Sequence, residues 1–355
     1  MKILVGMSGG VDSTVAAFLL KQAGHEVIGA TMSIWDSSQT FRNLTGKGCF
    51  SSHDEDIAAA KQICQNLNIP HLVIDCTSQF KQAVLNNFRQ EYLSGRTPNP
   101  CIVCNAKIKF DVLPQSARDQ GIVFDKFATG HYARLYHNQD SGLYQILRGT
   151  DYKKDQSYFL YRLTQDQLSQ IMLPLGDKTK DEIRALARQV GLAVSDKPDS
   201  QDFYTGPLND ILQFPPQKGY FKNKDGKILG THNGYWQFTT GQRRGLGISA
   251  DRPLYVIDII KQTNEVILGY AEDCLHRELI ATDWVWQIPA PKTDFYCQAR
   301  IRSSQTPIDV RVSYRSPDCY KIEFAQPQSA ITAGQSVVLN DQDTILGGGI
   351  IDSAC

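Results

Sequence analysis

The chain has 355 residues, of which 41% are hydrophobic, and its 37 Lys and Arg residues are balanced by 37 Asp and Glu residues. At roughly 100–200 residues per domain, this length predicts two or three domains with cores of their own, and the composition excludes a disordered or fibrous protein. A net charge of zero nominates no polyanionic partner and excludes none, because a charged patch on the folded protein does not show in a sum.

The 9 cysteines are odd in number and irregularly spaced, which argues against a secreted disulfide framework and for a reducing compartment. The first residues lack the basic and apolar regions of a signal peptide, and no apolar run approaches the roughly 20 residues that span a bilayer. We therefore expect a cytoplasmic protein that has no membrane partner.

The first 195 residues alternate short β-branched runs with helical stretches, which is the pattern of a parallel sheet covered by helices. Strands are predicted at 2–5, 26–34, 71–76 and 124–129. Helices are predicted at 13–22, 54–66, 78–93, 164–172 and 179–190. Thr179 and Glu182 have the spacing of a capping box at the start of the last helix.

After about residue 205 the helical periodicity disappears, and Gly, Pro and Asn separate short alternating runs. Such runs stand at 254–260, 265–268, 296–301 and 320–324. They predict mostly β structure, whose length allows one barrel or two small β domains. A new hairpin pattern opens near residue 277, where we place a domain boundary.

A glycine-rich loop follows the first predicted strand and leads directly into a helix, at Gly6-Met7-Ser8-Gly9-Gly10-Val11-Asp12-Ser13-Thr14. Adjacent glycines let the backbone approach an anion closely, and a helix N-terminus offers unpaired N–H groups and a positive dipole end. The spacing does not fit the dinucleotide fingerprint, and the lysine of a Walker loop is absent.

This loop resembles that of the N-type ATP pyrophosphatases, whose motif is Ser-Gly-Gly-x-Asp-Ser. The resemblance implies that a carbonyl oxygen of the substrate attacks the α-phosphate of ATP and that pyrophosphate leaves. It also implies that Asp12 helps to hold Mg²⁺, a cation that prefers oxygen ligands, while Ser8, Ser13 and the loop amides bind phosphate oxygens.

The segment from Gly95 to Asn105 reads GRTPNPCIVCN and continues into Ile108-Lys109-Phe110. It resembles the tRNA-specific 2-thiouridylase family, and seven further segments match the same family in the same order. These lie at 128–134, 154–160, 175–180, 199–202, 240–248, 334–336 and 346–351. The resemblance covers nearly the whole chain.

The family resemblance implies three domains that together hold the anticodon arm of tRNA. They are an α/β ATP pyrophosphatase domain of the adenine nucleotide alpha hydrolase type at 1–204, a central adaptor domain at 205–277 and a C-terminal β-barrel at 278–355. The implied reaction uses ATP to adenylate O2 of the wobble uridine, after which sulfur attacks C2 and AMP leaves. The target base must first be splayed out of its stack.

The same resemblance implies the site residues. ATP would be bound by the loop from Gly6 to Ser13, which includes Met7, Ser8, Gly9, Gly10, Val11 and Asp12, together with Met32 and Gly130. Asn99, Pro100 and Cys101 would line the target uridine, and Cys104 would be the nucleophile. Further tRNA contacts would come from His131, Lys154, Asp155, Gln156, Arg300, Ile301 and Gln335.

The match breaks at the cysteines. Most family members carry a second catalytic Cys shortly after the Asp-Ser-Gln-Asp segment, where this chain has Tyr204. A phenol cannot carry sulfane sulfur. Conversely, Cys101 stands where the family has Asp, which creates a Cys-x-x-Cys motif with Cys104.

Three interpretations of this motif remain open. Cys101 and Cys104 could be the sulfur-handling pair, one carrying a persulfide and the other closing a disulfide. They could instead join Cys49 in holding a [4Fe-4S] cluster, because Cys-x-x-Cys is a cluster-like spacing. In the third interpretation, Cys49 and Cys101 are small buried side chains and Cys104 works with sulfide from outside.

Two other functions compete with tRNA thiolation. One is amide or amidine synthesis through an adenylate, which explains the loop but not the GRTPNP segment. The other is a catalytically altered tRNA-binding relative, which the intact loop and Cys104 argue against. The expected partners are tRNA, with lysine, glutamate and glutamine tRNAs implied by the family, and a sulfur donor or relay protein.

Overall fold

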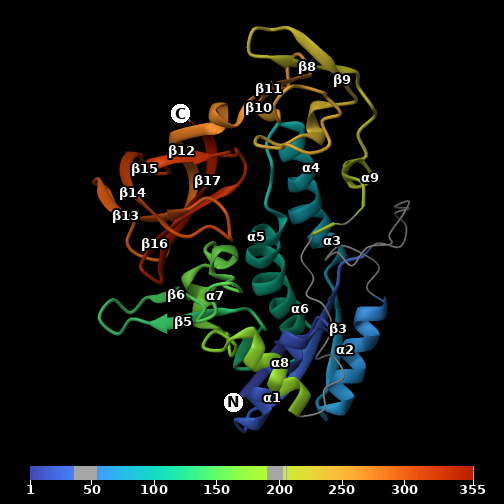
Figure 1. The fold of residues 1–355 in the computed structure, drawn as a ribbon. Coiled ribbons are helices and arrows are strands. Elements are labelled where there is room, and N and C mark those ends of the chain that lie inside the picture. The colour runs from blue at the N-terminus through green and yellow to red at the C-terminus, as the bar shows by residue number, and fades with distance from the viewer. Residues whose placement is uncertain (36–53, 190–202, 205, 355) are drawn as a thin grey trace. The chain divides into compact units, whose positions relative to one another are not determined.

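The computed structural model describes residues 1–35, 54–189, 203–204 and 206–354 (Figure 1). The chain forms two compact units. The first contains 1–85, 100–206 and 343–346, and the second contains 86–99, 207–342 and 347–355. The predicted Cys49 ligand and the segment 199–202 lie outside the described residues.

The first unit is built on a parallel sheet in the order β3-β2-β1-β4-β7. Its strands are β1 (Lys2–Gly6), β2 (Glu26–Ser33), β3 (His71–Asp75), β4 (Lys126–Ala128) and β7 (Ile171–Met172). Every neighbouring pair is parallel. The predicted parallel α/β architecture is therefore confirmed, because strands this apolar are stable only when helices cover them.

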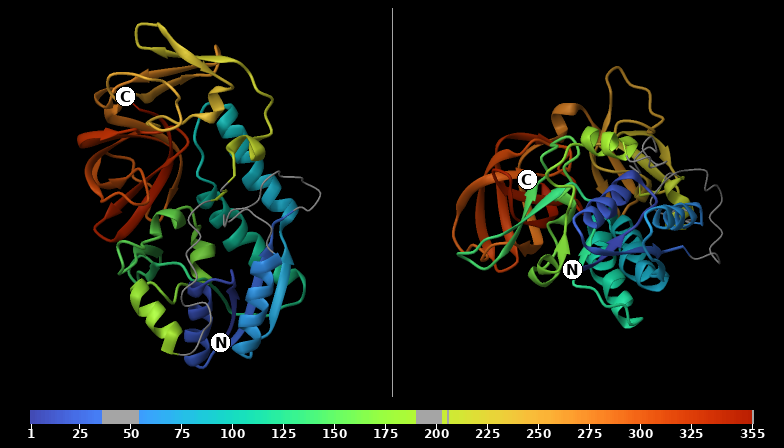
Figure 2. Two further views of the ribbon diagram at one scale, coloured as in Figure 1. Left: turned by 45° about the vertical axis from the view of Figure 1, so that its right-hand side comes forward. Right: turned by 90° about the horizontal axis from the view of Figure 1, so that it is seen from below.

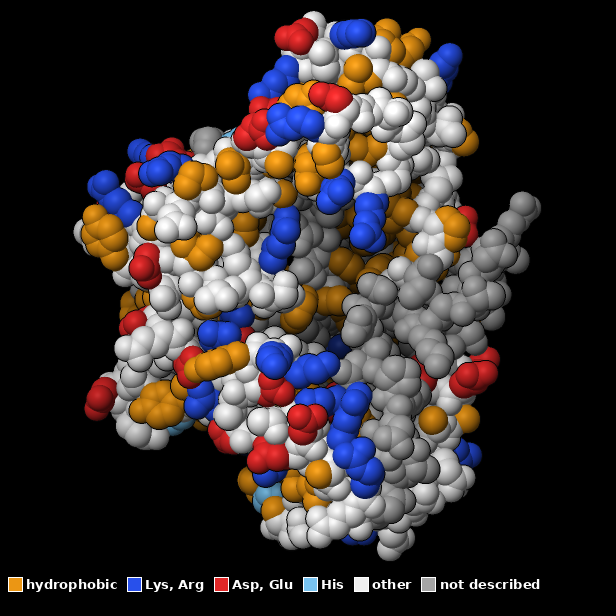
Figure 3. Space-filling model, viewed as in Figure 1, with side chains coloured by type: hydrophobic (Ala, Val, Ile, Leu, Met, Phe, Trp, Pro, Cys, Tyr) orange, Lys and Arg blue, Asp and Glu red, His pale blue; other side chains and the backbone are white. Residues whose placement is uncertain are grey.

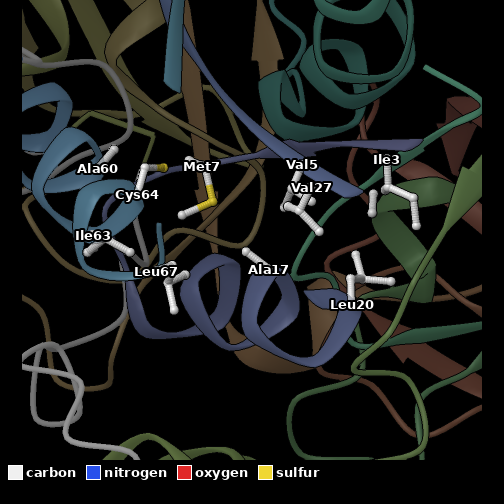
Figure 4. Close-up of a cluster of buried hydrophobic side chains, with 11 residues drawn as sticks. Ile3, Val5, Met7, Ala17, Leu20, Val27, Ala60, Ile63, Cys64 and Leu67 are labelled. Atoms are coloured by element: carbon white, nitrogen blue, oxygen red, sulfur yellow. The ribbon is translucent and has the colours of Figure 1, made fainter. Parts of the chain in front are cut away.

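Helices α1 (Val11–Gln22) and α2 (Asp54–Asn66) pack on β1 and β2 through one apolar cluster. Figure 4 shows Ile3 and Val5 of β1 facing Ala17 and Leu20 of α1, while Ile63 and Cys64 of α2, with Leu67 just after that helix, complete the cluster. A second cluster joins α1 to α8 (Lys180–Gln189). The capping box expected at the start of α8 is present, because the backbone N–H of Thr179 donates to Glu182 Oε2 (2.7 Å) and the backbone N–H of Glu182 donates to Thr179 Oγ1 (3.3 Å).

Between residues 77 and 119 the chain forms helical segments on either side of the non-helical stretch 94–99, and two of these segments are π-helical. The predicted helix at 78–93 appears as α3 (Thr77–Phe80), a π-helix (Lys81–Leu85) and α4 (Asn86–Leu93). The sequence did not indicate the next helices, which are α5 (Pro100–Cys104), a π-helix (Asn105–Val112) and α6 (Leu113–Asp119). π-Helical turns are rare in proteins, and those that do occur are often found at functional sites.

The helix predicted at 164–172 is too long. Only α7 (Gln165–Ser169) is helical, because Ile171 and Met172 form the edge strand β7 and pair with Phe127 and Ala128. The sequence also did not predict the antiparallel hairpin of β5 (Ala133–His137) and β6 (Tyr144–Arg148). Strand β5 is the edge strand, and Leu147 of β6 pairs with Thr344, the first residue of β17 (Thr344–Ala354).

The second unit is mostly β structure, as predicted for the chain after about residue 205, and it also includes α4 and the short helix α9 (Leu208–Leu212). A four-stranded sheet in the order β10-β11-β8-β9 contains β8 (Gly219–Asn223), β9 (Ile228–His232), β10 (Tyr255–Ile260) and β11 (Glu265–Gly269). Six further strands close into a β-barrel, because β12 pairs with both β15 and β17 (Figure 2). They are β12 (Leu275–Trp286), β13 (Phe295–Arg300), β14 (Ile308–Ser316), β15 (Cys319–Ser329), β16 (Ser336–Asp341) and β17 (Thr344–Ala354).

Among the described residues, no helix is long and apolar enough to cross a membrane.

Candidate nucleotide site and cysteine helix

The glycine-rich loop lies where the order of the sheet reverses. Strand β1 has β2 on one side and β4 on the other, so the loops that follow β1 and β4 diverge from the same edge. In open α/β sheets, ligands bind in the crevice at this point, beyond the carboxyl ends of the strands. The predicted ATP residues 6–13 run from the end of β1 through the first loop into α1, and Gly130 lies on the loop after β4.

Glycine is required within the loop. Gly9 has φ +70°, and a Cβ atom there would lie 2.8 Å from the backbone oxygen of Asp56. Gly10 is the N-cap residue of α1 and supplies no side-chain cap. The first N–H groups of a helix have no intrahelical partner, so this N-terminus is suited to bind an anion.

Hydroxyl groups hold the loop in shape. Ser13 Oγ accepts from the backbone N–H of Ser8 (3.2 Å) and donates to the carbonyl of Gly10 (3.2 Å). Thr14 Oγ1 donates to the same carbonyl (2.7 Å). Ser8 itself is exposed at the loop, where its hydroxyl can meet a ligand.

Not every predicted ATP residue offers a polar group. Met7 is buried, and Figure 4 shows its side chain in the apolar cluster near Cys64. Its N–H donates to Ala30 O (2.8 Å), and its carbonyl accepts from Thr31 Oγ1 (2.9 Å). Val11 is also buried, whereas Met32 on β2 is half-buried. The contacts of Met7, Val11 and Met32 with ATP stay predictions.

Gly130 packs directly against the first turn of α1. A Cβ atom at Gly130 would lie 2.7 Å from the carbonyl carbon of Asp12 and 2.8 Å from the N atom of Ser13. These are backbone atoms of α1, which cannot move aside as a flexible side chain could. The structure thus brings Gly130 together with the Ser-Gly-Gly-x-Asp-Ser loop, although 117 residues separate Gly130 from Ser13.

Asp12 has two partners that the sequence did not reveal. Tyr132 donates from its hydroxyl to Asp12 Oδ1 (2.7 Å), and Lys180 Nζ lies 2.8 Å from both carboxylate oxygens. The Lys180 side chain is only 6% exposed, so its charge needs this carboxylate. The segment that contains Thr179 and Lys180 matched the family, but the match assigned no role to Lys180. The capping box was the signal in the sequence that placed Lys180 at the start of a helix.

The two cysteines of the Cys-x-x-Cys motif lie on α5, three residues apart and therefore on one helix face. Cys104 is buried and Cys101 is half-buried. Neither forms a disulfide in the described part of the chain. The π-helix begins at Asn105, which donates from Nδ2 to the carbonyl of Phe159 (3.1 Å).

Other cysteines have the properties of structural thiols. Burial raises the pKa of Cys64 to about 11, and burial together with Asp75 raises that of Cys76 to about 11. Burial and Asp341 raise the pKa of Cys297 to about 12. Because the thiolate is the reactive form, these groups are inert at neutral pH.

No group of three or more metal-ligating side chains occurs within the ranges that the structure describes. Cys49 is outside those ranges, so the cluster interpretation stays a hypothesis. Tyr204, which stands where most of the family has its second Cys, is half-buried.

The residues around His131 are firmly held. His131 Nδ1 lies 2.8 Å from Thr129 Oγ1, and burial lowers the pKa of His131 to about 3, with a smaller contribution from Lys109. The ring is therefore neutral at neutral pH. It can offer a hydrogen bond or a stacking surface, but no charge.

Asp155 and Gln156, both predicted tRNA contacts, hold their own loop together. Asp155 pairs with Arg148 (3.2 Å) and accepts from the N–H groups of Gly149 and Ser157. Gln156 accepts from the Tyr132 N–H (2.9 Å) and donates its own N–H to the Tyr132 carbonyl (2.8 Å). Lys154, next to them, is half-buried.

In the second unit, the side chains of Arg300 and Ile301 are buried. Gln335 donates from Nε2 to the carbonyls of Thr97 (2.9 Å) and Pro98 (3.0 Å), just before Asn99 and Pro100. The tRNA contacts of these residues stay predictions. In the space-filling view, Lys and Arg side chains are interspersed with Asp and Glu side chains over the visible face (Figure 3).

Comparison with known proteins identifies the parts of the chain. Residues 1–204 match the family model of a tRNA methyl transferase HUP domain, so the α/β part of the chain is of the HUP class. Residues 208–270 match a tRNA methyl transferase PRC-barrel domain, and residues 276–351 match an aminomethyltransferase β-barrel domain.

Relatives match over the full length. The tRNA-specific 2-thiouridylase MnmA of Endomicrobium trichonymphae is 48% identical over 355 residues, which cover 99% of each chain. The protein of the same name from Carboxydothermus hydrogenoformans is 44% identical over 360 residues, which cover 99% of this chain and 97% of the relative. The chain belongs to the tRNA-specific 2-thiouridylase family.

One solved structure, a 4-thiouridine synthetase–RNA complex with bound ATP, is 17% identical with a TM-score of 0.33. The matched region covers 60% of this chain and 50% of the chain in that structure, and the similarity is too low to support a conclusion.

We predict that Gly130→Ala weakens ATP binding at least about tenfold, about 1.4 kcal/mol, because the added methyl group displaces the backbone of Asp12 and Ser13. Isothermal titration with a non-hydrolysable ATP analogue measures this change. Gly121→Ala is the control for general destabilisation, since its φ of +82° disfavours alanine but no atom lies within 4 Å of its added Cβ. Unchanged ATP affinity in Gly130→Ala would contradict the site.

Proposed function

We propose that this chain is a cytoplasmic, ATP-dependent tRNA uridine 2-sulfurtransferase that converts the wobble uridine of tRNA to 2-thiouridine. The observation that carries the proposal is a phosphate loop at the sheet reversal, in the same unit as a helix with Cys101 and Cys104. Full-length relatives named 2-thiouridylases support the substrate class. The lack of a Walker lysine supports pyrophosphate rather than phosphate as the leaving group.

ATP would be held by residues 6–13, Met32 and Gly130. The N-terminus of α1 and the hydroxyl of Ser8 would bind phosphate oxygens, which suits an anion beside a helix start. Asp12 fits a Mg²⁺ ligand, because its Oδ2 accepts from Lys180 and a carboxylate oxygen has a second lone pair. Mg²⁺ would neutralise charge on the departing pyrophosphate.

The uridine would enter a site lined by Asn99, Pro100 and Cys101, after leaving its base stack. Its O2 attacks the α-phosphorus of ATP and pyrophosphate leaves, which makes C2 electrophilic. Sulfur then attacks C2, and AMP leaves with the former O2. In a mechanism without a cluster, Cys104 would be the nucleophilic thiol in this sequence.

We further propose that Cys101 and Cys104, with Cys49, hold a [4Fe-4S] cluster, since two thiolates on one helix face fit two of its ligands. A cluster with one open iron site would supply a binding position for sulfur. The competing mechanism is a persulfide pair: one thiol carries the sulfane sulfur to C2, and the other displaces it as the pair closes a disulfide.

The partner would be the anticodon arm of tRNA, from lysine, glutamate and glutamine tRNAs, together with a sulfur donor or relay protein. Contacts to tRNA would come from His131, Lys154 to Gln156, Arg300, Ile301 and Gln335. The three domains would be an ATP pyrophosphatase domain at 1–204, an adaptor domain at 205–277 and a barrel at 278–355.

We expect the chain to restore 2-thiouridine in the tRNA of a strain that lacks this modification, measured by mass spectrometry of digested tRNA. Cys104→Ser should abolish the product, because a hydroxyl cannot transfer sulfur. Cys76→Ser, at a buried thiol with a raised pKa, should retain it. Unmodified uridine in cells that express the intact chain would defeat the proposal.

Anaerobic purification with iron and sulfide analysis tests the cluster. We expect about four irons per chain and their loss in Cys49→Ser, with activity lost as well. A chain that contains no iron, and a Cys49→Ser variant with full activity, would exclude the cluster and leave the Cys101 and Cys104 pair or Cys104 with external sulfide.

A further inference from the structure

Gln167, on α7, bonds to the π-helix that follows Cys104. Its Nε2 donates to the carbonyl of Ala106 (2.9 Å) and to that of Phe110 (3.3 Å). Its Oε1 accepts from the Thr164 N–H (2.9 Å), which is half of a capping box at the start of α7. Both hydrogens of the amide nitrogen and the amide oxygen are therefore used within the protein.

The sequence explains why the carbonyl of Phe110 needs a donor from another element. In an α-helix this carbonyl would accept from the N–H of residue 114, but Pro114 has no N–H, and its ring would collide with that carbonyl. The chain instead forms the wider turn of a π-helix, in which the Leu113 N–H donates to the carbonyl of Ile108, five residues back. Since Phe110 is buried, the amide of Gln167 supplies a bond that Pro114 cannot make.

The π-helix decides the direction of the helix before it. Cys104 is the last residue of α5, and the π-helix begins at the next residue. If residues 105–112 returned to α-helical spacing, α5 would rotate relative to α6 by about 100° for each residue gained, one residue's share of a helical turn. Such a rotation would carry Cys101 and Cys104 to another side of the helix axis. The register of the π-helix therefore determines where the two thiols lie.

The π-helix also packs beside the nucleotide site. The ring centroids of Phe110 and His131 are 5.5 Å apart, and those of Phe110 and Phe127 are 5.8 Å apart. His131 directly follows Gly130, and Phe127 belongs to β4. The π-helix thus connects the edge of the sheet with the cysteine helix, so its register sets how the thiols lie relative to the ATP loop.

We propose that Gln167 is a positioning residue: by holding residues 105–112 in the π-helical register, it fixes Cys101 and Cys104 for the sulfur-transfer step. The inference rests on the proposed function for the identity of that step. It applies to a thiol pair, to cluster ligands and to Cys104 with external sulfide, because each requires the Cys104 sulfur in a fixed place. ATP is held by other residues, so its affinity should not depend on Gln167.

The variant that tests the proposal is Gln167→Glu. A glutamate keeps the capping box, since its oxygen still accepts from the Thr164 N–H, but it has no hydrogen for the carbonyls of Ala106 and Phe110. Thr164→Ala is the matched control, because it removes the other bond of the capping box and leaves the Gln167 amide intact. Gln62→Glu, at an exposed glutamine of α2, controls for the added charge.

The first measurement is the rate at which 2-thiouridine accumulates after induction in a strain that lacks this modification. We expect Gln167→Glu to be at least about tenfold slower than the intact chain, because a displaced sulfur atom reacts slowly. Thr164→Ala and Gln62→Glu should stay within about twofold of the intact chain. The Kd of Gln167→Glu for a non-hydrolysable ATP analogue should also stay within about twofold.

An unchanged rate in Gln167→Glu, or an equal loss in Thr164→Ala, would overturn the positioning role. ATP binding weakened about tenfold in Gln167→Glu would overturn it as well, because the variant would then have lost more than the position of the thiols.

Alkylation gives a readout that does not depend on the reaction. Cys104 is buried, so in the reduced, metal-free protein we expect iodoacetamide to modify it at least about fivefold faster in Gln167→Glu than in the intact chain. Cys76, a buried thiol in the same unit, should keep its rate. An unchanged rate at Cys104, or a rise at both cysteines, would overturn the proposal. If the intact chain forms no 2-thiouridine, the proposed function fails, and alkylation still decides the role of Gln167.

Discussion

The site depends on one close contact, that of Gly130 with the first turn of α1. The loops after β1 and β4 can meet only because residue 130 has no side chain, since any Cβ would collide with the backbone of Asp12 and Ser13. The contact leaves the N-terminus of α1 at the edge where the sheet order reverses. The first N–H groups of the helix and the positive end of its dipole therefore lie together at this edge, where they favour an anion.

Electrostatic balance at this point comes from residues distant in sequence. Lys180 from α8 and Tyr132 from the loop after β4 both bond to the carboxylate of Asp12. Lysine is costly to bury alone, so the ion pair couples the position of α8 to the phosphate loop. The chain has no lysine within the loop, yet an ammonium group lies beside it.

The sequence was most informative where local rules act. The alternation of β-branched runs with helical stretches predicted the parallel sheet, helix α2 begins and ends as expected, and the Thr179 capping box is present. It failed where distant partners decide. Ile171 and Met172 continue a helical pattern but form an edge strand beside β4. Helix α5 and its π-helix follow two prolines, without an amphipathic repeat to mark them, and the contact of Gln335 with Thr97 spans 238 residues.

The central claim is that the phosphate loop serves adenylation of a uridine oxygen, and an isotope experiment tests it most directly. The enzyme would be given tRNA carrying ¹⁸O at C2 of the wobble uridine, with ATP and a sulfur source, and the nucleotide product analysed by mass spectrometry. The account predicts AMP that contains the ¹⁸O, formed with pyrophosphate and in step with 2-thiouridine. Formation of ADP and phosphate, or of AMP without the label alongside 2-thiouridine, would contradict it.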